Sequence, residues 1–261
     1  YTGGAAIGPD LYRFYRAIGI NLKQLYGQTE TLAYVCKQPN GEARLDSVGT
    51  PMPGVEIKVG EKGEILVKSP GLLKEYYKNP QATEESITHD GFFRTGDAGF
   101  IDQDGHLKII DRAKDVGTLN DGTMFAPQFL ENKLKFFPFI KEVVCFGDKR
   151  DAVCAFINIE MDAVGNWAER QGIGYSGYVD LASKPEVYVL LQTCIEQVNQ
   201  DLAKDDTLSG SQIKRFLILH KELDADDDEL TRTRKVRRDF VAEKYEVVVT
   251  ALYNDAKECF I

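Results

Sequence analysis

The sequence predicts a mixed α/β protein built from two domains, and three observations support this. At 261 residues the chain exceeds the usual size of one domain, and an apolar content of 43% suffices for two cores. Up to residue 111, short strand-like runs alternate with glycine and proline; beyond residue 114, helices alternate with strands. We therefore expect domains at 1–111 and 112–261, with a boundary near 112–115.

Amphipathic spacing and turn residues define the elements of the first domain. After Pro9, apolar residues at helical spacing predict a helix over 11–18. Glycine and proline then separate short runs that we expect to form a small antiparallel β-barrel. These runs lie at 20–25, 32–37, 55–59 and 64–67.

Two local signals organise the end of this domain. Asn79 can cap a helix that begins at Pro80 and covers 81–87. Asp104-Gly105 favours a tight hairpin turn between strands at 100–102 and 106–110. The hairpin therefore delivers Asp111 and Arg112 at its exit.

The second domain begins with another predicted hairpin, around Asn120-Asp121-Gly122, and Pro127 then opens a helix. Strands are expected at 143–146 and 153–159, a helix at 162–170 and a loose segment at 172–177. The helix that begins at Pro185 is predicted by a core-facing apolar stripe. The stripe contains Val187, Leu190, Leu191, Cys194, Val198 and Leu202.

Composition excludes several classes of function. A net charge of −9 argues against a nucleic-acid surface, which needs a basic footprint. The five cysteines are scattered and include no CxxC pair, as is typical of reduced thiols in a cytoplasmic protein. His89, His106 and His220 lack zinc-ligand spacing. No apolar run approaches the roughly 20 residues of a membrane span, and the start at Tyr1 suggests a piece of a longer protein.

Four short motifs occur in a fixed order with helix and strand patterns between them, and their order is more informative than any one of them. They are Tyr26-Gly27-Gln28-Thr29-Glu30, Arg94-Thr95-Gly96-Asp97, Asp111-Arg112-Ala113-Lys114 and Thr233-Arg234-Lys235.

The first motif resembles the YGxTE motif of the AMP-forming acyl-CoA synthetase superfamily, and the resemblance covers nearly the whole chain. The sequences of residues 126–134 and 231–238 are most similar to those of the long-chain fatty-acid CoA ligase branch. The resemblance implies the end of a large adenylate-forming domain, containing the β-barrel, followed by a mobile α/β lid domain.

The resemblance also implies a nucleotide site. Gly3, Gly4 and Ala5 would line the adenine pocket, because glycine lets the backbone approach closely. In the YGxTE motif, Tyr26 would face the base, Gly27 would keep the turn tight and Thr29 would bind the α-phosphate. Glu30 would hold Mg²⁺, which prefers few protein oxygens together with phosphates.

The middle motifs would complete the nucleoside site. Asp97 would accept both ribose hydroxyls, Arg112 would also contact the ribose, and Ile109 would form an apolar floor. Arg94 is interpreted as structural. Lys114 would be the hinge about which the lid swings. The hairpin at Gly122 resembles the loop that lines the pantetheine channel.

Lys235 matches the catalytic lysine of the family, which places a cation at the reacting phosphate. The family usually reads Thr-Pro-Thr-Leu-Lys-Val-Lys-Arg here, so Arg232 replaces proline and Arg234 replaces leucine. Taken alone, this basic cluster could also bind nucleic acid or an anionic membrane, but the motif spacing argues against that.

The resulting hypothesis is a fatty acid:CoA ligase that uses ATP, Mg²⁺ and CoA and releases AMP and pyrophosphate. A peripheral membrane association of the full-length enzyme and its oligomeric state stay open. One alternative is an adenylation domain for another carboxylic acid, although such domains usually have glycine where Arg234 stands. The other is a non-catalytic nucleotide-binding or scaffold protein, since the phosphate loop and most of the acyl tunnel lie outside these residues.

Overall fold

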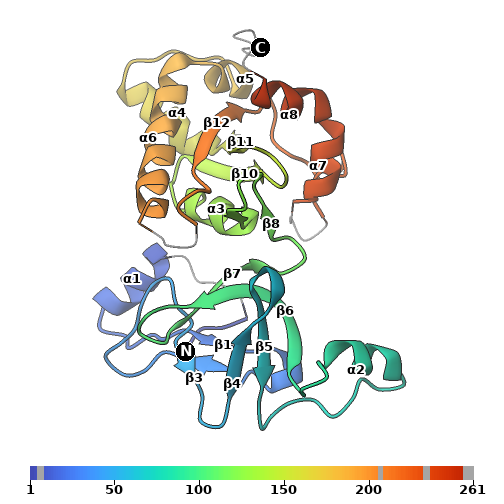
Figure 1. Ribbon diagram of the computed structural model, residues 1–261. Helices are drawn as coiled ribbons and strands as arrows, with labels where there is room; N and C mark the ends of the chain where they lie inside the picture. The colour runs from blue at the N-terminus through green and yellow to red at the C-terminus, as the bar shows by residue number, and fades with distance from the viewer. Residues whose placement is uncertain (5–8, 205–207, 232–235, 255–261) are drawn as a thin grey trace. The chain divides into compact units, whose positions relative to one another are not determined.

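The computed structural model describes residues 1–4, 9–204, 208–231 and 236–254. The chain divides into two compact units, residues 1–116 and 117–261, each with its own sheets and core (Figure 1). Among the described residues, no helix has both the length and the apolar character needed to cross a membrane.

The first unit combines two small sheets with two helices. The predicted helix after Pro9 is confirmed as α1 (Pro9–Ala17), and α2 is Pro80–Ser86. Short 3₁₀ turns lie at η1 (Thr29–Thr31) and η2 (Glu61–Gly63). The strands are β1 (Leu25–Tyr26), β2 (Cys36–Lys37), β3 (Thr50–Pro51), β4 (Glu56–Val59), β5 (Glu64–Lys68), β6 (Phe93–Ile101) and β7 (Leu107–Arg112).

The expected β-barrel is wrong. Strands β4, β5, β6 and β7 form an open antiparallel sheet in that order, while β1, β2 and β3 form a separate one. Gly49, which directly precedes β3, forms an isolated antiparallel bridge with Leu107 on the outer edge of β7; among the described residues this is the only β-bridge between the two sheets. Four strands do not meet the strand number and stagger that closure requires.

Strand lengths in the smaller sheet also differ from the prediction. Of the segment 20–25, only Leu25 enters β1, because Gly19 (φ +87°) ends a turn and the Leu22 N–H bonds back to the Ile20 oxygen at 2.7 Å. Of 32–37, only β2 is extended, since Leu32 and Ala33 adopt left-handed backbone angles.

The local signals for α2 and for the hairpin are confirmed. The Asn79 side chain accepts a hydrogen bond from the Ala82 N–H at 3.1 Å and so caps α2. Gly105 has a φ of +81° in the turn between β6 and β7. At the other end of this hairpin, Asp97 pairs with Arg112.

The second unit contains the predicted hairpin, strands and helices, together with four elements that were not predicted. The predicted ones are β8 (Gly117–Thr118), β9 (Met124–Phe125), α3 (Pro127–Leu134), β10 (Ile140–Phe146), β11 (Val153–Ile159), α4 (Met161–Arg170) and α6 (Pro185–Leu202). The others are α5 (Tyr178–Ala182), β12 (Ile213–Ile218), α7 (Arg238–Lys244) and α8 (Glu246–Tyr253).

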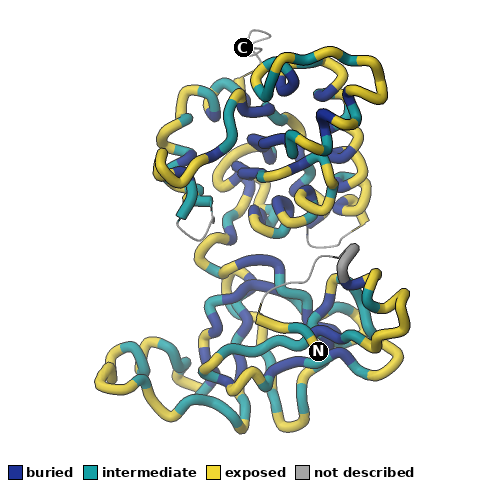
Figure 2. The backbone as a smooth tube through the Cα atoms, turned by 180° about the vertical axis from the view of Figure 1, so that it is seen from behind, coloured by how far each residue is buried: buried dark blue, intermediate teal, exposed yellow. Residues whose placement is uncertain are grey.

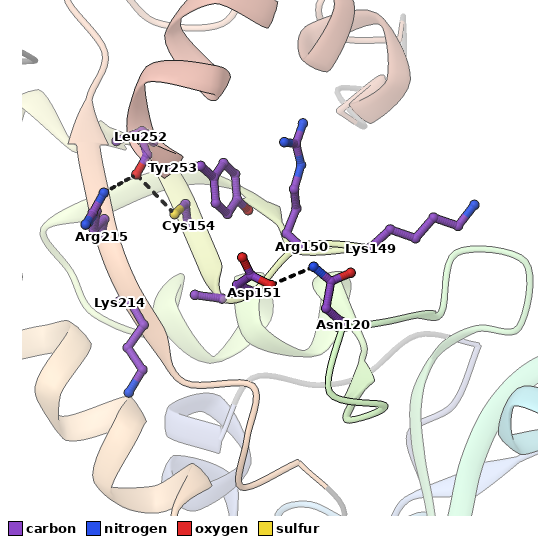
Figure 3. Close-up of a pocket in the computed structure, with 10 residues that line it drawn as sticks. Asn120, Lys149, Arg150, Asp151, Cys154, Lys214, Arg215, Leu252 and Tyr253 are labelled. Atoms are coloured by element: carbon purple, nitrogen blue, oxygen red, sulfur yellow. Dashed lines mark hydrogen bonds between the residues drawn. The ribbon is translucent and has the colours of Figure 1, made fainter. Parts of the chain in front are cut away.

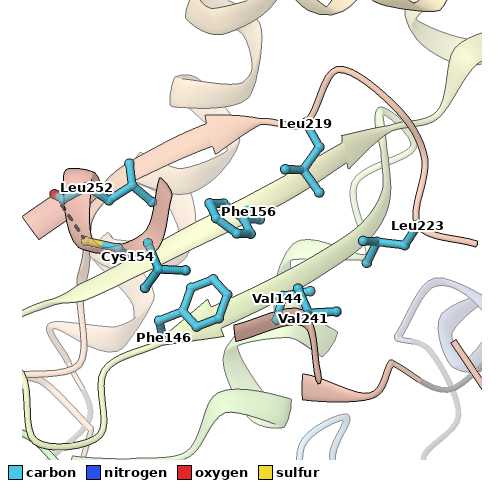
Figure 4. Packing of buried hydrophobic residues seen from close by; sticks show 9 residues of the cluster. Val144, Phe146, Cys154, Phe156, Leu219, Leu223, Val241 and Leu252 are labelled. Carbon is cyan, nitrogen blue, oxygen red and sulfur yellow. Dashed lines mark hydrogen bonds between the residues drawn. The ribbon is translucent and has the colours of Figure 1, made fainter. Parts of the chain in front are cut away.

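A three-stranded sheet forms the centre of this unit. Strand β11 pairs antiparallel with β10 and parallel with β12, and every residue of β11 is buried. One face packs against α7 and α8 through a cluster that includes Phe146, Phe156 and Val241 (Figure 4). Helix α3 packs against β10, and α6 contacts both α3 and β12. The buried strands are enclosed by helices that alternate buried and exposed residues (Figure 2).

Candidate functional site

The first unit brings Asp97 together with three donors from different segments. The Tyr26 hydroxyl and the Gln28 Nε2 each donate to Asp97 Oδ2 at 2.7 Å. Arg112, at the end of β7, donates to Oδ1. The Asp97 side chain is 12% exposed and that of Arg112 50%. Two predicted site residues and one motif residue thus meet at one predicted carboxylate.

The local backbone fixes Asp97 in this position. Gly96 has a φ of +66°, and a β-carbon there would lie 3.2 Å from an Arg112 guanidinium nitrogen. The Thr95 hydroxyl donates to the Ile65 oxygen at 2.7 Å and accepts from the Asp97 N–H at 3.1 Å. This part of β6 therefore directs the Asp97 side chain toward Tyr26 of β1, while Thr95 is hydrogen-bonded to β5.

Burial and the Asp97 charge both keep the Tyr26 hydroxyl protonated. Burial raises the pKa of Tyr26 far above its ordinary value, and the neighbouring carboxylate raises it further. Tyr26 is therefore a hydrogen-bond donor to Asp97 across the neutral pH range.

The glycines of the predicted site serve local packing. A β-carbon at Gly27 would lie 2.4 Å from the Ala33 carbonyl carbon, so only glycine fits that turn. Gly3 lies beside β1, where a β-carbon would meet the Leu25 side chain at 2.7 Å, and Gly4 has a φ of +85°. Ala5 lies outside the described residues.

Thr29 and Glu30 lie in η1, which begins three residues after the end of β1 at Tyr26. Thr29 is exposed and Glu30 is half-buried. The Glu30 side chain accepts a hydrogen bond from the Tyr76 hydroxyl at 3.0 Å, and its backbone oxygen accepts from the Leu73 N–H at 2.6 Å. Glu30 is thus a half-buried carboxylate whose position is supported by the segment around residues 71–76.

The donor set fits a magnesium ion that is bound chiefly by phosphates. Among the described residues, no group of three or more histidine, cysteine or acidic side chains could enclose a metal. Mg²⁺ does not need such a cage, because one or two carboxylates, substrate phosphates and water complete its octahedron. Glu30 offers a suitable hard oxygen donor.

The remaining predicted residues of the first unit lie on β7 and just after it. Ile109 is half-buried and packs against the cluster around Val35 and Ile65. Lys114 is exposed in the turn that follows β7. Arg94, on β6, forms an ion pair with Glu64 at 3.1 Å, and its structural role stays a prediction.

Lys235 lies outside the described residues, but the segments on both sides of it are described. Leu230 and Val236 form an antiparallel bridge, and the Arg237 N–H bonds to the Glu229 oxygen at 2.9 Å. On the C-terminal side, a single guanidinium nitrogen of Arg238, Nη2, donates to both carboxylate oxygens of buried Glu131, at 2.8 and 2.6 Å.

Glu229 has a fully buried side chain and anchors the N-terminal side. It accepts hydrogen bonds from Lys244 at 2.8 Å, Tyr245 at 2.7 Å and the Asp224 N–H at 2.9 Å. Burial raises its pKa, but these three donors and the Lys221 charge outweigh burial, so the pKa falls below its ordinary value.

The lowered pKa predicts an acid-labile anchor. A depressed carboxylate pKa stabilises the fold above the unfolded value, near 4, and this stabilisation is lost as pH falls through the folded value. We expect amide protection of 224–231 and α7 to fall below about pH 4. Glu229→Gln should lower that protection roughly tenfold at neutral pH and remove its acid dependence. Hydrogen exchange measures both effects.

Glu222→Gln is the matched control, because Glu222 forms an exposed pair with Lys141 in the same region. We expect protection in this variant to match the wild type. An unchanged pH profile in Glu229→Gln would show that the Glu229 network does not anchor this segment.

Sequence reasoning missed Gln28 and Tyr76 as site residues. Gln28 occupies the variable position of the YGxTE motif, yet its amide donates to both Asp97 and the Thr95 oxygen, the latter at 2.8 Å. Its polarity was the available signal. Tyr76 lies 46 residues from Glu30, and no motif links the two.

A hollow of about 420 Å³ in the second unit contains none of the predicted site residues (Figure 3). Its lining includes Lys149, Arg150 and Lys214. These side chains extend in different directions instead of meeting at one point, so we assign no ligand there.

Comparison with known proteins gives two family matches. The model of the AMP-binding enzyme family matches residues 1–77, and that of the AMP-binding enzyme C-terminal domain matches residues 114–257. The chain is 34% identical to the long-chain-fatty-acid–CoA ligase FadD15 of Mycobacterium bovis over 97% of its length. It spans 41% of that relative.

Solved structures show the same fold at lower identity. The adenylation domain of a carboxylate reductase from Mycobacterium chelonae superposes with a TM-score of 0.67 at 22% identity, covering 97% of this chain and 38% of that one. The A domain of the carboxylic acid reductase of Segniliparus rugosus, solved with AMP and a co-purified carboxylic acid, gives 0.65 at 22% identity, covering 96% and 38%. The family matches confirm the resemblance predicted from the four motifs, and the chain belongs to the AMP-binding enzyme family.

Proposed function

We propose that this chain supplies the nucleotide site and the lid of an enzyme that activates a fatty acid as an acyl adenylate and transfers it to CoA. The observation that carries the proposal is the cluster around Asp97. Its carboxylate accepts hydrogen bonds from Gln28 and Tyr26, which lie 69 and 71 positions earlier in the sequence. The 34% identity to a long-chain-fatty-acid–CoA ligase favours a fatty acid as the substrate.

Each group then has a chemical task. Asp97 and Arg112 bind the ribose, Thr29 binds the α-phosphate and Glu30 holds Mg²⁺, which neutralises phosphate charge when ATP is bound. Lys235 stabilises the charge that accumulates as a carboxylate oxygen attacks the α-phosphorus and pyrophosphate leaves. The second unit is the lid, and it pivots at Lys114 between the adenylating and thioester-forming reactions.

A second candidate is the activation of another carboxylic acid. The fold is shared with adenylation domains of carboxylic acid reductases, one of them solved with a co-purified carboxylic acid. A scaffold protein that binds nucleotide without turnover is the third.

Exchange of labelled pyrophosphate into ATP, driven by a panel of acids, separates these candidates on the complete gene product. Exchange that is fastest with long-chain fatty acids, followed by CoA thioester formation, is the expected result. Exchange restricted to aromatic or short acids would favour the second candidate. AMP binding without exchange for any acid would favour the scaffold.

A further inference from the structure

A strap of the first unit, residues 71–76, crosses the η1 turn that carries Glu30. The Leu73 N–H bonds to the Glu30 oxygen at 2.6 Å, and Gly71 lies so close to η1 that a β-carbon would be 3.2 Å from the Thr31 oxygen. The Tyr76 hydroxyl reaches the Glu30 carboxylate at 3.0 Å. The strap therefore contacts both the backbone and the side chain of Glu30.

Helix α2 fixes the C-terminal end of this strap. The Tyr76 N–H donates to the Thr83 hydroxyl at 2.9 Å, and the Asn79 N–H bonds to the Tyr76 oxygen at 3.1 Å. Asn79 also caps α2 through the Ala82 N–H. A capped helix thus positions the tyrosine whose hydroxyl contacts Glu30.

We propose that Tyr76 is a positioning residue that holds one oxygen of Glu30, Oε1, and thereby directs the other, Oε2, toward the metal of the bound nucleotide. This inference rests on the proposed function, in which Glu30 is the magnesium ligand. Groups that hydrogen-bond to metal ligands orient them, and their loss typically lowers metal affinity or activity 10–100-fold.

Tyr76 is suited to this role because its phenolic hydroxyl can donate a hydrogen bond and lies 3.0 Å from Glu30 Oε1. Phenylalanine would keep the ring and lose only the hydroxyl, so Tyr76→Phe isolates the contact. Tyr77 is the matched control, because its side chain is 83% exposed and no described residue hydrogen-bonds to its hydroxyl.

The test measures metal binding apart from turnover. Titration of Mn²⁺ into the complete gene product with ATP, followed by electron paramagnetic resonance, gives the dissociation constant of the metal. We expect Tyr76→Phe to raise that constant about tenfold and Tyr77→Phe to leave it unchanged. The Mg²⁺ concentration for half-maximal pyrophosphate exchange should rise by the same factor, and saturating Mg²⁺ should restore the rate.

Four outcomes would overturn different statements. Equal Mn²⁺ affinity in the wild type and Tyr76→Phe would refute the positioning role and leave the proposed function intact. A rate that saturating Mg²⁺ does not restore would assign Tyr76 a general structural role instead. Unchanged Mn²⁺ affinity in Glu30→Gln would remove the metal assignment, and no exchange by the wild type with any acid would remove the proposed function.

Discussion

Replacing Lys235 by alanine in the complete gene product should slow acyl-adenylate formation by about 10²–10³-fold, the usual cost of losing one preorganised donor at a developing charge. Thioester formation from supplied acyl adenylate and CoA should stay near the wild-type rate, because the phosphorus is no longer attacked in that step. Single-turnover assays of the two half-reactions measure both effects.

The basis of this expectation is the arrangement of the chain around Lys235. The described flanks are joined by the Leu230–Val236 bridge and anchored by two buried carboxylates, Glu229 and Glu131. Holding both flanks lowers the conformational entropy of the chain around Lys235. In the proposed function, this would reduce the entropic cost of placing the lysine at the phosphate.

Arg237→Ala controls for the loss of one positive charge in the same cluster. Arg237 is 43% exposed and pairs with Asp228 at the surface. Its removal should change either half-reaction by less than about threefold, as expected for a surface ion pair. A uniform loss of both half-reactions in Lys235→Ala would refute the assigned role, because a structural defect affects both steps.

The motifs that the sequence reveals are contiguous, whereas the site is assembled by long-range pairing. Tyr26, Asp97 and Arg112 could each be proposed as site residues from the short motif that contains them. Their meeting depends on the register of β6 and β7, which pairs Asp97 with Arg112, and a slip of one residue would turn Asp97 to the opposite face. The supporting role of Tyr76 depends on a strap that no periodicity predicts.

The failures in fold prediction have a similar cause. Glycine and proline correctly separated β4 and β5, but turn residues carry no information on whether the outer strands pair, so closure into a barrel did not follow. Strand β12 was missed although Ile213 and Ile218 are buried, because its middle residues Lys214 and Arg215 are charged and exposed. It pairs parallel with β11, and a long segment of chain separates the two strands, so no local turn signal indicates the pairing.

Asp97→Asn should weaken AMP binding about 100-fold. Two hydrogen bonds from the ribose to a carboxylate contribute about 1.5–3 kcal/mol each, and an amide offers one acceptor oxygen in place of two. Its amide nitrogen would face donors already present, Gln28 or Arg112. Isothermal titration with AMP, at a temperature where circular dichroism shows the variant folded, measures the change in dissociation constant.

Asp104→Asn is the control for the charge change. Asp104 lies in the turn of the same β6–β7 hairpin as Asp97, is 67% exposed and pairs with Arg44 from another loop. Its AMP affinity should equal that of the wild type.

A second ligand separates ribose binding from structural support, because Asp97 also holds Tyr26 and Gln28. The wild type should prefer AMP strongly over 2′,3′-dideoxy-AMP. Asp97→Asn should show a much smaller preference for AMP, since only one of the two acceptor oxygens for the diol remains. If Asp97→Asn lowered both affinities in parallel and kept the preference, Asp97 would only support the site, and another residue would contact the ribose.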